Sequence, residues 1–122
     1  MSKTANQILG RLGERLALEH YERLGFMLLE RNYRTRIGEI DLVVCDRRAT
    51  IFVEVKTRRA GGLDPLLSIT ALKRRRMRAL AAAWLADHRE RPRSAVLRID
   101  AVAIVVDERG ALVSLEQFED VA

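Results

Sequence analysis

The most strongly patterned part of the chain is a pair of apolar runs at residues 40–45 and 51–55. Both runs are rich in valine and isoleucine, which are favoured in strands, and a short polar segment at residues 46–49 separates them. A tight turn in this segment sets an antiparallel register in which Cys45 lies opposite Thr50. The pattern therefore predicts a β-hairpin whose register can be followed residue by residue.

This register gathers four charged residues on one side of the hairpin. Asp41 falls opposite Glu54, and Glu39 falls opposite Lys56. Two carboxylates in directly opposed positions destabilise a strand pair, because their Cβ atoms lie roughly 5 Å apart. The alternate positions of both strands are apolar, and we expect them to face the core. These positions are Ile40, Leu42, Val44, Ile51, Val53 and Val55.

The four charges admit two interpretations. In the first, this side of the sheet is solvated and the charges form weak cross-strand pairs. In the second, the side is partly covered, because Val43, Cys45 and Phe52 share it, and the like charges then need a cation or a proton. Asp41 and Glu54 would offer the hard oxygen ligands that Mg²⁺ or Mn²⁺ prefers. The nearby lysine is suited to orienting or deprotonating a water molecule, or to stabilising the charge on a phosphate.

The spacing of these residues resembles the PD-(D/E)xK motif of nucleases, in which an aspartate precedes a Glu-x-Lys segment. Two longer strings are similar to one branch of that superfamily in particular, the YraN family of bacterial proteins, which is related to archaeal Holliday-junction resolvases. These strings are Gly38-Glu39-Ile40-Asp41-Leu42-Val43 and Phe52-Val53-Glu54-Val55-Lys56-Thr57-Arg58. The proline of the motif is missing, because Ile40 precedes Asp41.

The resemblance implies an α/β fold of the restriction-endonuclease-like type, a three-layer sandwich with a central mixed sheet flanked by helices. It also implies metal-dependent hydrolysis of phosphodiester bonds in DNA, with branched or otherwise structured DNA as the first substrate to consider. Asp41 and Glu54 would hold Mg²⁺ or Mn²⁺, and Lys56 would position the attacking water. A homodimer is expected as well, because related resolvases use two sites on a two-fold substrate.

Glu14 is the fourth candidate catalytic residue, and it follows Gly13 in an otherwise amphipathic segment. Taken alone, it is a surface glutamate beside an apolar stripe, paired with a neighbouring arginine. In the family that the chain resembles, a glutamate at this Gly-Glu position is a candidate ligand of the metal. The catalytic set implied by the resemblance is therefore Glu14, Asp41, Glu54 and Lys56.

Hydrophobic periodicity and capping signals place the other elements. A helix is predicted over residues 4–24, with Thr4 as its N-cap and Gly25 as its C′ residue. A second helix, capped by Ser68, is predicted to reach Asp87. Further strands are predicted at residues 26–30, 95–106 and 111–115. The order α-β-β-β-α-β-β agrees with the fold that the resemblance implies.

The strand predicted at residues 95–106 carries two opposite charges, Arg98 and Asp100. Charges in an apolar strand are costly unless they are satisfied. This Arg-x-Asp segment is characteristic of the family that the chain resembles. We interpret it as structural and expect Asp100 to bond Arg31 or Arg34.

The basic residues favour a polyanionic partner. The formal net charge is +5, and only three of the 22 basic residues are lysines, which suits phosphate recognition. Residues 57–65 are expected to form a loop at the mouth of the site. Four cations in succession on a helix cannot all face one partner, so we expect some of them to be solvated. The candidate nucleic-acid-binding residues are Arg31, Arg34, Arg36, Arg58, Lys73, Arg74, Arg75 and Arg76.

Length and composition fit a single endonuclease-like domain over residues 1–122. A signal peptide and a membrane span are not apparent, and we expect a cytoplasmic protein without membrane contacts. Two other functions are compatible with the same residues. One is a non-catalytic nucleic-acid-binding module, which would bind DNA in a salt-dependent manner without metal. The other is a structural or regulatory domain that keeps the nuclease fold and binds a partner protein.

Overall fold

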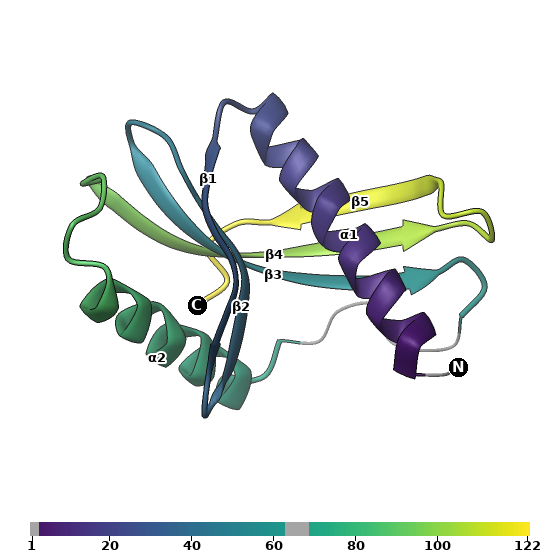
Figure 1. Cartoon of the computed structure of the whole chain (residues 1–122), viewed down its shortest axis with the longest axis horizontal. Coiled ribbons are helices and arrows are strands. Elements are labelled where there is room, and N and C mark those ends of the chain that lie inside the picture. Colours follow the sequence, from purple (N-terminus) through teal and green to yellow (C-terminus); the bar gives the residue numbers. More distant parts are fainter. Residues whose placement is uncertain (1–2, 63–68) are drawn as a thin grey trace.

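The computed structural model describes residues 3–62 and 69–122 and has the predicted order of elements (Figure 1). The elements are α1 (Lys3–Arg23), β1 (Met27–Thr35), β2 (Gly38–Cys45), β3 (Ala49–Arg59), α2 (Ala71–Asp87), β4 (Val96–Val106) and β5 (Leu112–Phe118). No helix in these two ranges is long and apolar enough to cross a membrane.

The strands form one sheet of five strands in the order β1-β2-β3-β4-β5. Neighbouring strands are antiparallel except β3 and β4, which are parallel. The chain passes through α2 between these two parallel strands, because parallel neighbours need a crossover connection. The sheet is therefore mixed, as predicted.

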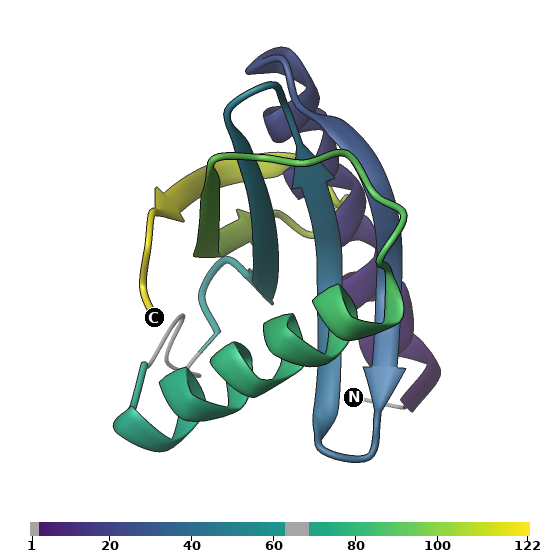
Figure 2. The ribbon, with the colours of Figure 1, turned by 90° about the vertical axis from the view of Figure 1, so that its left-hand side faces the viewer.

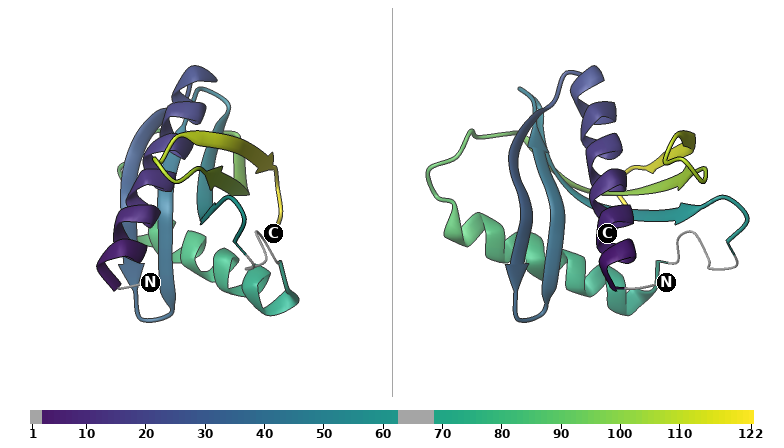
Figure 3. Two further views of the ribbon diagram at one scale, coloured as in Figure 1. Left: turned by 90° about the vertical axis from the view of Figure 1, so that its right-hand side faces the viewer. Right: turned by 45° about the vertical axis from the view of Figure 1, so that its right-hand side comes forward.

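The two helices cover opposite faces of the sheet. Figure 2 shows α2 in front of the strands and α1 behind them, and Figure 3 shows the reverse order from the other side. Each helix has its own core. Ala17 and Tyr21 of α1 pack with Leu42 and Val53, among other residues. The α2 core is made by Val43, Phe52, Met77, Leu80 and Trp84 with their neighbours. The predicted three-layer α/β architecture is confirmed.

The hairpin of β2 and β3 has the predicted register, but it is shorter than predicted. Pairs run from Cys45 and Thr50 to Leu42 and Val53, and there the two strands part. Beyond this point β2 stays paired with β1, and β3 stays paired with β4 as far as Arg59. Figure 1 shows β1 and β2 diverging from β3 and β4. We call this opening between β2 and β3 the fork.

The fork overturns three details of the predicted hairpin. Asp41 is not paired with Glu54, and Glu39 is not paired with Lys56, because ladder pairing ends at Leu42 and Val53. Ile40 does not join Leu42 and Val44 on the α1 side, but packs in the α2 core. The ladder between β1 and β2 pairs Arg31 with Leu42 and Tyr33 with Ile40 but has no pair between Asn32 and Asp41, and Asn32 has a left-handed backbone with φ of 55°. The strict alternation on which the prediction depended is therefore broken.

Several predicted boundaries are also wrong. Thr4 lies inside α1 rather than capping it. The α2 helix is capped by Thr70, whose side chain accepts a hydrogen bond from the Lys73 N–H, and the predicted cap Ser68 lies outside the described residues. The first strand runs on to Thr35, and the last strand runs on to Phe118. Residues 57–59 belong to β3 rather than to a loop, because they continue its pairing with β4.

Gly13 is the point of closest approach between α1 and β3. A Cβ atom at this position would lie 1.7 Å from the Thr57 Oγ1 atom. Only glycine permits such contact between a helix and a strand, since it has no side chain. The close packing holds the next residue of the helix, Glu14, over the fork.

The charge of Asp100 is satisfied within the α1 side of the sheet. Its carboxylate is fully buried and accepts hydrogen bonds from Arg98 at 2.8 and 2.9 Å. Further donors are the Tyr21 hydroxyl, the Gln117 amide and the Asp120 backbone N–H. The predicted bond to Arg31 or Arg34 is therefore wrong. Burial alone would raise the pKa of Asp100, but these hydrogen bonds outweigh it and hold the pKa below its usual value.

Candidate functional site

Three carboxylates meet at the fork. Glu39 and Asp41 come from β2, and Glu14 comes from α1, which packs across the opening. Each contributes one oxygen atom to a group in which all ligand atoms lie within 4.8 Å of one another. We call these residues the fork carboxylates. Two of them, Glu14 and Asp41, were candidate metal ligands on sequence grounds, and Glu39 was not.

Asp41 is the buried member of the group, with 8% of its surface exposed. Its Oδ2 atom accepts a hydrogen bond of 2.6 Å from the Val55 backbone N–H, so the carboxylate fills the place where the ladder between β2 and β3 would continue. Burial raises the pKa of Asp41 to about 8. The hydrogen bond opposes this shift, whereas the charges of Glu14, Glu39 and Glu54 add to it. The site therefore demands a proton or a cation.

Glu14 is half-buried beside Asp41. Burial raises its pKa, and the negative charge of Glu39 raises it further. A side-chain hydrogen bond from Asn32 and the charges of Arg31 and Arg34 act in the opposite direction. The raised pKa has the same cause as that of Asp41, since carboxylates are crowded into a partly buried space.

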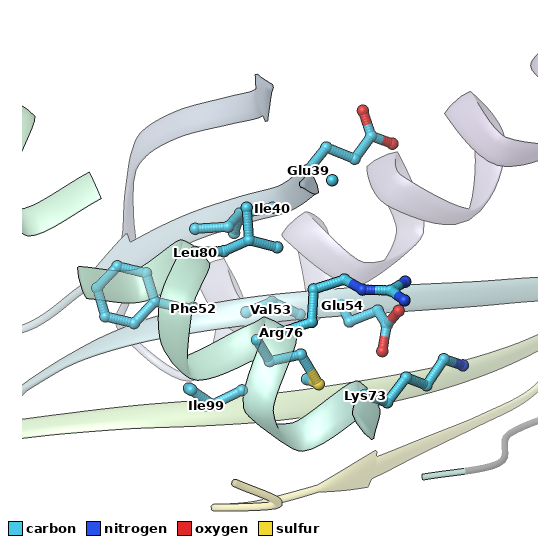
Figure 4. A pocket seen from close by; sticks show the side chains of 11 residues that line it. Glu39, Ile40, Phe52, Val53, Glu54, Lys73, Arg76, Leu80 and Ile99 are labelled. Carbon is cyan, nitrogen blue, oxygen red and sulfur yellow. The ribbon is translucent and has the colours of Figure 1, made fainter. Parts of the chain in front are cut away.

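Glu54 lies next to the fork carboxylates but outside the group of three. It lines a pocket of about 160 Å³ together with Glu39, Lys73 and Arg76, above an apolar floor. Figure 4 shows the side chains of Lys73 and Arg76 extending toward the same region as Glu54. The Glu54 Oε2 atom is buried and has no hydrogen-bond partner in the described part of the chain. This oxygen is therefore available to a ligand.

Lys56 is exposed and lines a hollow of about 520 Å³ between the start of α1 and the end of β3. Glu14 lines the same hollow, so the structure brings the predicted lysine and one predicted acid to one cavity. We call this cavity the α1–β3 hollow. The other predicted residue in it is Arg58, which is half-buried at the end of β3.

The basic residues predicted on β1 separate into different environments. Arg31 lies near Glu14 and lines a hollow of about 600 Å³ between α1 and β1, which we call the α1–β1 hollow. Arg34 forms an ion pair of 3.1 Å with Glu39, and the two side chains are 79% and 42% exposed, respectively. Arg36 is exposed in the turn between β1 and β2.

The basic run on α2 divides between two sides of the helix, as four successive cations must. Lys73 and Arg76 line the pocket of Glu54. Arg74 lines a separate hollow with Arg78 and the last residues of the chain. Arg75 is exposed and lines none of these cavities. The run therefore presents two of its four cations toward the fork carboxylates.

The fork carboxylates fit a divalent cation with oxygen ligands, such as Mg²⁺ or Mn²⁺. They supply closely spaced oxygens, and Asp41 is too buried to remain ionised without compensation. The orphaned oxygen of Glu54 beside them is a fourth possible ligand. The charge of Glu54 acts on Asp41, which places the two carboxylates close together.

Three residues of this region were missed on sequence grounds. Glu39 stands two positions before Asp41, and its place on the same strand face was the available signal. Arg11 and Arg15 line the α1–β1 hollow on either side of Glu14 in the helix. Helical spacing places them on the flank of Glu14, but no signal in the sequence says that this flank is near the site.

The chain matches the model of a family described as "Uncharacterised protein family UPF0102" over residues 13–104. A UPF0102 protein of Corynebacterium efficiens is 42% identical over 120 residues, which cover 98% of this chain and 95% of the relative. A UPF0102 protein of Mycobacterium tuberculosis is 42% identical over 113 residues, covering 89% of this chain and 87% of the relative. The YraN-type membership indicated by the two sequence strings is confirmed, and the chain belongs to the UPF0102 family.

Proposed function

We propose that this protein is a metal-dependent nuclease that hydrolyses phosphodiester bonds in DNA. The observation that carries the proposal is the group of fork carboxylates, in which a buried Asp41 with a pKa of about 8 lies within reach of Glu14 and Glu39. Crowded carboxylates are costly to a fold. A site that gathers them beside cation-lined hollows suits a divalent ion and a phosphate.

The fork carboxylates and Glu54 would hold Mg²⁺ or Mn²⁺. When bound, the ion would stabilise the negative charge that develops on a phosphate during hydrolysis. Lys56 shares the α1–β3 hollow with Glu14, and its ammonium group would orient the attacking water or neutralise a phosphate oxygen. Lys73 and Arg76 would draw the polyanion toward the fork from the α2 side.

The preferred substrate is proposed on the resemblance to nucleases of branched DNA, and fold alone does not determine it. Cleavage of single-stranded, duplex and four-way-junction DNA with Mg²⁺ or Mn²⁺ tests the proposal directly. We expect metal-dependent cleavage that falls at least about 100-fold in both Asp41→Ala and Lys56→Ala. Matched controls are Glu90→Gln and Arg47→Ala, which change exposed charges away from the fork.

Two other results would replace the proposal. Salt-sensitive DNA binding without cleavage, unchanged in both variants, would favour the non-catalytic binding module. Absence of both binding and cleavage would favour RNA or a protein partner instead. The homodimer stays a prediction, and light scattering on the purified protein tests it.

A further inference from the structure

The two hollows beside α1 share one member, Glu14, and have the same sign of charge. Glu14 lines both of them and so stands on the boundary between them. The cations of the α1–β1 hollow are Arg11, Arg15 and Arg31. The cations of the α1–β3 hollow are Lys56, Arg58 and Arg59. Positive charge therefore lies on both sides of the fork carboxylates.

The fold itself leaves several of these cations without partners. Arg11 and Arg15 are exposed, and neither forms an ion pair or hydrogen bond with another residue in the described ranges. Arg58 donates one long bond of 3.4 Å from Nη1, and its Nε atom is buried with no partner among the described residues. A buried donor without an acceptor is costly. The buried Nε of Arg58 is thus not satisfied by the described part of the fold, and the exposed Arg11 and Arg15 are free to bind anionic oxygens.

We propose that the two hollows bind the phosphates of one polynucleotide strand, on the two sides of the bond held at the fork carboxylates. This inference rests on the proposed function and specifies its substrate. A strand that occupies both hollows continues past the site in both directions. The substrate class is therefore a chain cut at internal phosphodiester bonds, rather than one trimmed from its ends. Arg11 and Arg15 are assigned to phosphate binding on one side, and Arg58 on the other.

The salt dependence of DNA binding tests this assignment without any need for cleavage. A fluorescently labelled single-stranded DNA oligonucleotide is titrated with protein in EDTA, and the anisotropy is followed over a series of salt concentrations. Each phosphate contact contributes about 0.7 to the slope of log affinity against log salt on a single strand. We therefore expect the slope to fall by about 1.4 in the double variant Arg11→Gln/Arg15→Gln, and by about 0.7 in Arg58→Gln.

The matched control is Arg47→Gln/Arg48→Gln, which removes the same charge as the double variant but lies at the turn between β2 and β3, away from the fork. The control should keep the wild-type slope, and thermal melts should show that all variants are folded. The triple variant Arg11→Gln/Arg15→Gln/Arg58→Gln should add the two losses, because both hollows contact the same strand.

Two outcomes would overturn the inference. The first is a slope in Arg11→Gln/Arg15→Gln that equals that of the control. The second is a triple variant that binds like Arg11→Gln/Arg15→Gln, which would leave the strand in one hollow only. A protein that shows the expected slopes but cleaves nothing would contradict the proposed nuclease and leave the strand path intact. Cleavage of DNA by the wild type, together with variants whose slopes equal that of the control, would support the proposed nuclease and contradict the strand path.

Discussion

Asp41 is an ionisable side chain that lies buried at the fork. Its carboxylate replaces a ladder hydrogen bond by accepting the Val55 N–H at 2.6 Å. That role needs only an acceptor oxygen, which a neutral side chain also provides. The ionised form is disfavoured by burial and by three neighbouring carboxylates. An ionisable carboxyl group at this position therefore serves something other than the stability of the metal-free protein.

This leads to a prediction for the pH dependence of stability without metal. Folding raises the pKa of Asp41 from 3.8 to about 8, so the folded chain binds more protons than the unfolded chain between these values. The stabilisation of the folded chain by proton binding at Asp41 is fully present below about pH 4 and is lost as pH rises through about 8. A pKa difference of one corresponds to about 1.4 kcal/mol. We expect Asp41→Asn to match wild type near pH 4 and to exceed its unfolding free energy by up to about 6 kcal/mol near pH 9.

Urea unfolding in EDTA at several pH values measures this difference. The control Glu90→Gln removes an exposed carboxylate and should follow the wild-type curve. If the unfolding free energies of Asp41→Asn and wild type changed in parallel with pH between about 4 and 9, the raised pKa of a buried group at the fork would be contradicted.

At the scale of elements, the position of α1 depends on Gly13. The helix approaches β3 so closely that a Cβ atom would collide with Thr57. Glu14 follows directly and reaches the fork from this contact. The Gly-Glu pair thereby has a physical explanation. Gly13 allows α1 to approach β3 closely, and this approach brings the Glu14 carboxylate to the fork.

Substitution of Gly13 by alanine should lower the stability of the protein, whereas substitution of Gly10 in the same helix should raise it. Gly13→Ala must displace α1 or Thr57, and we expect it to destabilise the fold by about 1–3 kcal/mol. Gly10→Ala meets no atom within 4 Å, so it should stabilise the helix by about 0.5–1 kcal/mol. Denaturant unfolding of both variants tests this. Equal effects of the two substitutions would contradict the close packing of α1 on β3.

The sequence predicts the elements well where local chemistry decides them. The register that pairs Cys45 with Thr50 follows from a short polar turn between two alternating runs, and the structure has it. Alternation also implies that pairing continues to Asp41, and there the prediction fails. β3 is paired with β4 from Ala49 to Arg59, and β2 is paired with β1, so beyond the pair of Leu42 and Val53 each strand follows its outer neighbour. The pairing of β3 with β4 joins residues far apart in the chain, and local alternation does not reveal it.

Contacts between distant residues also limited what could be predicted about charges. Arg98 and Asp100 lie two residues apart on one strand, so alternation places them on the same face, but the predicted partner of Asp100 was Arg31 or Arg34 rather than Arg98. The donors from Tyr21 and Gln117 come from α1 and β5, and only the packed layers bring them together. The same reason explains why the α1–β1 hollow, with its exposed arginines, was not foreseen.

In the whole molecule, the two helices supply different chemistry to one opening in the sheet. From one face, α1 contributes the carboxylate of Glu14. From the other, α2 contributes Lys73 and Arg76 to the adjoining pocket (Figure 4). The sheet divides at the fork, so acids and cations from opposite layers gather around the same space. A metal ion with a polyanion above it would complement this arrangement.

The measurement that tests the metal site most directly is a calorimetric titration of the protein with Mg²⁺ and with Mn²⁺ between about pH 6 and pH 8. Binding must displace the proton held by Asp41, so we expect the affinity of wild type to rise about tenfold per pH unit. Asp41→Asn should lose most of the affinity and this pH dependence, whereas Glu90→Gln should keep both. Binding of equal strength in wild type and Asp41→Asn, or no binding to either, would contradict a metal site at the fork.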